Sequence, residues 1–178
     1  KYLGLNPDSH EDEDIAKAEE ALLAIRPYIQ KFHSSEYIQA LANGDICVAV
    51  GWSGDILQAR DRAVEAENGV EIAFNAPKEG AQMWFDQMAI PVDAPNVDGA
   101  HKFLNFIMDA ENMAAASNYV YYANGNKASQ EFLIEDVMGD PAIYPSAETL
   151  DNLFTTTPYA PKVQRVVTRA WTKIKSGI

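Results

Sequence analysis

Cysteine and histidine are scarce in this chain, and their scarcity argues against several kinds of site. Among 178 residues there are one cysteine and three histidines. Cys47 cannot form a disulfide within the chain, and we expect it to pack as a small hydrophobic residue in an apolar run. His10, His33 and His101 show no spacing typical of a metal site. The sequence therefore predicts no structural zinc, no other metal and no cofactor.

Basic residues and long apolar runs are also lacking. Lysine and arginine number 14 against 26 acidic residues, which gives a net charge of -12. Nucleic acids and anionic membranes are recognised by basic surfaces, so we expect neither as a partner. No run reaches the ~18 consecutive apolar residues of a membrane span, so we expect no membrane insertion. The negative charge would attract cationic ligands, although it could also serve only to keep the protein soluble.

What the chain does have is enough apolar sequence for a substantial core. Hydrophobic residues make up 47% of its 178 residues, which suits one compact domain or two small lobes. The first residues have neither an initiator methionine nor a signal peptide, so the sequence reads as a chain joined partway through.

Short apolar runs alternate with stretches of helical spacing. Strands are expected at 46–50, 70–75 and 83–90, and helices at about 56–65, 97–108, 111–119 and 161–175. Apolar runs of this length are typical of parallel or mixed sheets with helices on both faces. We expect the apolar stripes of 97–108 and 161–175, including Trp171, to be buried core.

Two pairs of tryptophan and aspartate are the most informative feature. Trp52 and Asp55 follow the predicted strand 46–50 at its carboxyl end, where α/β folds place ligands. Trp84 and Asp86 lie two apart in a predicted strand and would share one face. An indole face and a carboxylate can together hold an organic ammonium group. Two such pairs suggest a ligand with two ammonium ends.

An enzyme is the first alternative. Paired carboxylates also hydrolyse glycosides, and Ser53 lies in a turn that resembles a nucleophile elbow. The turn lacks the final glycine of such an elbow, and no histidine is near it in sequence to act as a base. We therefore predict a binding protein and no catalytic residue.

The order of several motifs along the chain closely resembles the periplasmic spermidine/putrescine-binding proteins of bacterial ABC importers. The motifs are Arg26-Pro27-Tyr28, Phe32-His33-Ser34-Ser35, Gly51-Trp52-Ser53-Gly54-Asp55, Trp84-Phe85-Asp86, Tyr122-Ala123-Asn124 and Arg169-Ala170-Trp171-Thr172-Lys173-Ile174-Lys175. The resemblance runs along essentially all 178 residues. It covers about the carboxyl-terminal half of that family's length.

The resemblance implies a two-lobed α/β fold, the type II periplasmic solute-binding fold, with mixed sheets flanked by helices. This chain would be about half of it: 1–81 part of the second lobe, 82–121 returning to the first lobe, and 122–178 crossing back to the second lobe with the carboxyl-terminal helices. The resemblance also implies five ligand-binding residues, which are Trp52, Asp55, Trp84, Asp86 and Tyr122.

The function implied is that of a periplasmic protein, made with a signal peptide in its precursor, that captures spermidine between two lobes and delivers it to ABC permease subunits. The missing amino-terminal half would supply further partners for the ligand. A putrescine-preferring member of the family is the alternative; another cationic solute, or a polyamine sensor without transport, stays open. We expect the indole of Trp84, where the family has either Phe or Trp, to favour spermidine over putrescine.

Overall fold

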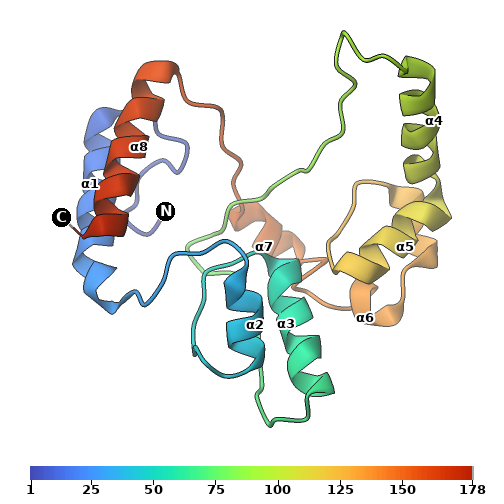
Figure 1. Cartoon of the computed structure of the whole chain (residues 1–178), viewed down its shortest axis with the longest axis horizontal. Helices are drawn as coiled ribbons and strands as arrows, with labels where there is room; N and C mark the ends of the chain where they lie inside the picture. The colour runs from blue at the N-terminus through green and yellow to red at the C-terminus, as the bar shows by residue number, and fades with distance from the viewer. Residues whose placement is uncertain (178) are drawn as a thin grey trace. The chain divides into compact units, whose positions relative to one another are not determined.

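The computed structural model describes residues 1–177, which form helices joined by irregular segments (Figure 1). The α-helices are α1 (Asp12–Ile25), α2 (Glu36–Ala42), α3 (Ser53–Glu65), α4 (Val97–Met108), α5 (Ala110–Val120), α6 (Glu135–Met138), α7 (Ala147–Asn152) and α8 (Pro161–Ser176); two 3-10 helices are η1 (Arg26–Tyr28) and η2 (Lys127–Phe132). The helices predicted from hydrophobic spacing are confirmed to within a few residues. No helix in this part of the chain is long and apolar enough to cross a membrane.

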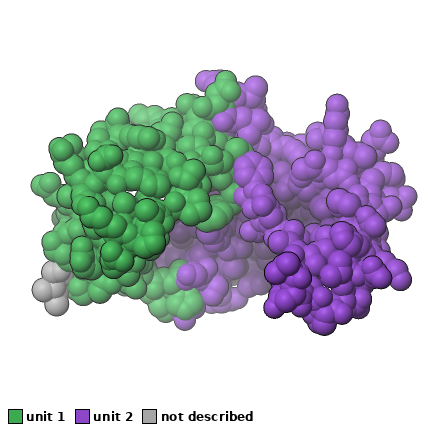
Figure 2. Space-filling view, turned by 90° about the horizontal axis from the view of Figure 1, so that it is seen from above, with its two compact units in different colours: residues 1–33, 77–84, 151–178 green, residues 34–76, 85–150 purple. Residues whose placement is uncertain are grey.

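The chain divides into two compact units, coloured green and purple in Figure 2. Unit 1 comprises residues 1–33, 77–84 and 151–178, and unit 2 comprises residues 34–76 and 85–150. These units are defined by contacts within the chain, whereas the predicted lobes belong to a longer protein. The lobe boundaries therefore stay a prediction.

Unit 1 is built on the pairing of α1 with α8, which lie side by side (Figure 1). Ala170 and Ile174 of α8 are buried, and Lys173 Nζ lies 2.6 Å from Glu19 Oε1 of α1. The indole of Trp171, which was predicted to be buried, is 44% exposed, and it meets Phe32 edge to face with ring centroids 5.3 Å apart. The last helix thus packs through Ala170 and Ile174, whereas the predicted burial of Trp171 is wrong within this chain.

Unit 2 is organised around α3, which is held from two sides. Ile56 and Ala59 pack with Leu41 of α2 in one buried cluster. Leu57, one residue further along the helix, packs with Val137 of α6 in a second cluster. Because both clusters lie in the first two turns of α3, they fix the position of its amino-terminal end.

The predicted strands at 46–50, 70–75 and 83–90 are not formed in the described part of the chain. An isolated parallel bridge joins Gln82 to Phe154 in unit 1. A strand needs a neighbouring strand to bond its N–H and C=O groups. Val48 and Val50 are 85% and 101% exposed, so no element within residues 1–177 covers the predicted strand 46–50 at these residues. Cys47 beside them is also exposed, so its predicted packing is wrong within this chain. The sheets of the predicted α/β fold therefore stay a prediction for a longer protein.

The apolar stripe of α4 also differs from expectation. Phe103, Phe106 and Met108 are exposed, and no residue of this helix is buried. Helical spacing identifies an apolar face but not the element that covers it. Among the described residues α4 packs chiefly against α5, which leaves this face open.

Candidate ligand-binding site at the start of helix α3

Asp55 lies in the first turn of α3, whose N-cap residue is Trp52. The N–H of Ile56 donates to the carbonyl oxygen of Trp52 at 3.1 Å and closes this turn. A carboxylate in the first helical turn is stabilised by the helix dipole and by the unpaired N–H groups nearby. The sequence thus places a negative charge where the helix favours one.

Tyr37 of α2 binds both the carboxylate and the main chain at this point. Its hydroxyl donates to Asp55 Oδ2 at 2.5 Å and accepts from the N–H of Trp52 at 3.3 Å. In a capping box, the third residue of the helix reaches back to the N-cap N–H directly. Here Asp55 occupies that third position, and the hydroxyl of Tyr37 lies between the two groups.

Tyr122 approaches the same carboxylate from another element. Its hydroxyl donates to Asp55 Oδ1 at 3.3 Å. The preceding residue, Tyr121, ends α5 in the left-handed conformation, with φ 59°. On the other side of Tyr122, Asn124 bonds the hydroxyls of two buried serines, Ser117 at 2.8 Å and Ser129 at 3.0 Å. The segment carrying Tyr122 is therefore anchored at both ends.

Two glycines make room for these tyrosines. A Cβ atom at Gly54 would lie 2.2 Å from the ring of Tyr122, and one at Gly51 would lie 2.6 Å from the ring of Tyr37. Any side chain at either position would overlap a ring. The loop before α3 is therefore shaped to admit two phenol rings beside one carboxylate.

The site favours the protonated form of both tyrosines. Burial, with the hydrogen bond to Asp55, raises the pKa of Tyr37 to about 12. Burial, with the charge of Asp55, raises the pKa of Tyr122 to about 12. Both hydroxyls thus remain donors at neutral pH. A carboxylate has about four lone-pair positions, so each oxygen of Asp55 keeps one for a further donor.

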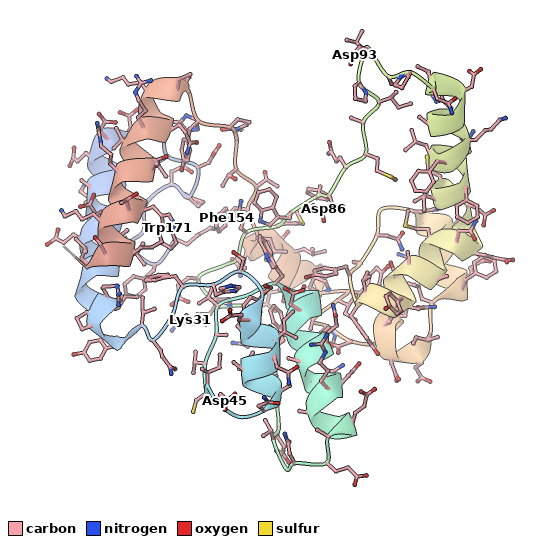
Figure 3. The ribbon with its side chains drawn as sticks, viewed as in Figure 1. Lys31, Asp45, Asp86, Asp93, Phe154 and Trp171 are labelled. Atoms are coloured by element: carbon pink, nitrogen blue, oxygen red, sulfur yellow. The ribbon has the colours of Figure 1, made fainter. Side chains whose placement is uncertain are left out.

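Of the five predicted ligand-binding residues, the structure brings three together. Trp52, Asp55 and Tyr122 meet at the start of α3, and the indole of Trp52 is 47% exposed. Trp84 belongs to unit 1. Asp86 lies exposed on the irregular segment that leads to α4 (Figure 3). The participation of Trp84 and Asp86 in one site with Asp55 stays a prediction.

Tyr37 is the residue of this site that the sequence did not indicate. It precedes Asp55 by 18 residues and reaches it through the packing of α2 against α3. No spacing rule relates residues that far apart on different helices. The two glycines around Trp52 are the available signal, because a turn that contains them admits bulky neighbours.

Comparison with known proteins identifies the family. Residues 2–145 match the family described as bacterial extracellular solute-binding protein. The chain belongs to this family. It is 51% identical over 176 residues to the putrescine-binding periplasmic protein SpuD of Pseudomonas aeruginosa. It is 50% identical over 177 residues to the putrescine-binding periplasmic protein PotF of Escherichia coli.

Each of these alignments covers 99% of this chain and 48% of the length of the relative. A solved structure, described as a putative spermidine/putrescine ABC transporter from Listeria monocytogenes, superposes with a TM-score of 0.82 at 28% identity, over 97% of this chain and 52% of that one. The chain thus spans about half the length of the curated relatives it matches. The predicted resemblance to polyamine-binding proteins of ABC importers is confirmed.

The family also bears on two further predictions. Its members are described as solute-binding proteins, which confirms the prediction of a binding protein rather than an enzyme. The predicted periplasmic location is confirmed by the extracellular family and the periplasmic relatives.

Proposed function

We propose that the protein of which this chain forms about half binds putrescine between two lobes and delivers it to an ABC permease. The observation that carries this proposal is the carboxylate of Asp55, which is held by the hydroxyls of Tyr37 and Tyr122. The indole of Trp52, three residues earlier in the chain, is 47% exposed. The two relatives that are 51% and 50% identical to this chain are named as putrescine-binding proteins. The name of the Listeria structure, at 28% identity, includes spermidine. Putrescine, the alternative in the sequence interpretation, therefore replaces spermidine as the main ligand.

The chemistry of the site suits one end of a diamine. An ammonium group that is buried without a partner costs several kcal/mol, because it loses strong hydration. Asp55 offers charge and one open lone-pair position on each oxygen. The indole of Trp52 would add about 0.5 to 2 kcal/mol if the ammonium lay over its face.

The second ammonium requires a second acidic partner. Asp86, with Trp84 two residues earlier, is our candidate within this chain, and the rest of the protein would supply additional aromatic and acidic groups. We infer that 46–50, 70–75 and 83–90 become strands when the rest of the protein supplies neighbouring strands. The exposure of Val48 and Val50 supports this inference.

Calorimetric titration of the full-length protein with putrescine, and separately with spermidine, at two salt concentrations tests the proposal. We expect binding of both, tighter for putrescine and weakened by salt, because the ligand is held by charge. Absence of heat with both polyamines would overturn the proposal and would favour another cationic solute. Tighter binding of spermidine would favour spermidine as the main ligand, as expected from the sequence.

A further inference from the structure

We infer that Tyr37 is a positioning residue for ligand recognition: it holds the carboxylate of Asp55 away from the helix terminus and toward the ligand. The inference rests on the proposed function, because it concerns the same carboxylate. Tyr37 need not touch the ligand, since its hydroxyl is engaged by Asp55 and by the main chain of Trp52.

The direction of the hydroxyl proton follows from the partners of Tyr37. The N–H of Trp52 can only donate, so it occupies the hydroxyl as an acceptor. The single proton of the hydroxyl is then free to go to Asp55 Oδ2. Because the pKa of Tyr37 is raised, the proton stays in place throughout the pH range in which an amine ligand is charged.

Removing this hydroxyl would leave a donor, the N–H of Trp52, and an acceptor, the carboxylate of Asp55, that can bond to each other. The N–H of Trp52 would lose its acceptor, and Asp55 would lose a donor. Asp55 stands at the position from which an acidic side chain reaches the N-cap N–H directly. We therefore expect the carboxylate to turn onto the N–H of Trp52 in a direct capping box. This turn would change the orientation in which Tyr37 holds the carboxylate for the ligand.

The packing of Tyr37 makes a clean test possible. Its ring contacts the buried cluster of Leu41, Ile56 and Ala59, and the substitution Tyr37→Phe keeps this ring. Tyr119→Phe is the matched control, because it removes a hydroxyl from a side chain that is 83% exposed.

The experiment compares putrescine binding by the full-length protein and by the variants Tyr37→Phe, Asp55→Asn and the double variant. We expect Tyr37→Phe to lower affinity about 10-fold, as for a hydrogen bond to a charged group. In the Asp55→Asn background the same substitution should change affinity less than about 2-fold, because it acts through Asp55. Equal losses in both backgrounds, or no loss from Tyr37→Phe alone, would overturn the inference.

A second readout needs no ligand and separates failure of this inference from failure of the proposed function. The amide of Trp52 should exchange its hydrogen slowly in the unaltered protein and in Tyr37→Phe, where Asp55 takes over as acceptor. It should exchange at least about 10-fold faster in a double variant that combines Tyr37→Phe with Asp55→Ala, because alanine, unlike asparagine, leaves no side-chain acceptor. Unchanged exchange in this double variant would contradict the bridge through Tyr37 even if putrescine were not the ligand.

Discussion

At the scale of the residue, we expect recognition to depend on how the lone pairs of Asp55 are divided. Each carboxylate oxygen accepts one tyrosine hydroxyl, from Tyr37 on Oδ2 and from Tyr122 on Oδ1. The carboxylate is thereby held in one orientation before the ligand arrives. A preorganised acceptor loses less conformational freedom on binding than a mobile one.

The two tyrosines predict a loss of stability at high pH. Both have a pKa raised from 10.0 to about 12 in the folded protein. The protonated forms therefore favour the folded state; their stabilisation is complete below pH 10 and is lost as the pH rises through about 12. Urea denaturation at pH about 9 and about 11 measures it. Replacing Tyr37 and Tyr122 together with Phe should reduce the loss, whereas Tyr119→Phe should not; equal losses in all three proteins would be inconsistent with the raised pKa values.

Trp84 gives a prediction about ligand choice. We expect from the sequence that the indole of Trp84 shapes the pocket for spermidine, so Trp84→Phe in the full-length protein should raise the affinity for putrescine relative to spermidine. Competition titrations with the two polyamines measure this ratio. If the ratio does not change, Trp84 has no part in selecting the length of the ligand.

At the scale of the element, the start of α3 depends on the absence of two side chains. Gly54→Ala would place a Cβ atom 2.2 Å from the ring of Tyr122. We expect it to lower the free energy of unfolding by about 1 to 3 kcal/mol through overpacking, and to weaken putrescine binding because Tyr122 must move. Gly125→Ala is the control, since no atom lies within 4 Å of its added Cβ. Thermal and urea unfolding of both variants test this; equal stabilities would argue against the close contact.

The helices were predictable from sequence because each carries its own hydrogen bonds and its own periodicity. The bounds of α4 and α8 agree with the spacing of their apolar residues. The strands were not predictable in the same way. The run 46–50 has the composition of a strand, but a strand forms only beside a neighbouring strand, and composition does not show whether one is present. For the same reason the spacing in α4 could not show that Phe103 and Met108 would be exposed.

The candidate site was predictable only in part. Trp52 and Asp55 were found because both groups lie in one short motif, and Tyr122 because its surroundings resemble a known family. Tyr37 was missed because packing between two helices, rather than spacing in the sequence, brings it to Asp55. Contacts of this kind require the fold to be known.

At the scale of the whole molecule, this chain spans about half of the length of its relatives. Apolar side chains such as Val48, Val50 and Phe106 are exposed in it. We expect the isolated chain to unfold at lower urea concentration than the full-length protein and to bind putrescine more weakly, because it lacks both packing partners and part of the site. Urea denaturation and calorimetry on the two forms provide the comparison; equal affinity in the isolated chain would refute the view that the site is shared.

The most direct test of the account is calorimetric titration of the full-length protein and of its Asp55→Asn variant with putrescine. Asp93→Asn, the same change at an exposed position on the segment before α4, is the control (Figure 3). We predict that Asp55→Asn lowers affinity by roughly 10-fold or more, because an ammonium loses its charged partner, while Asp93→Asn leaves affinity unchanged. Equal affinity of the Asp55→Asn variant and the unaltered protein would contradict the assignment of this carboxylate to the ligand.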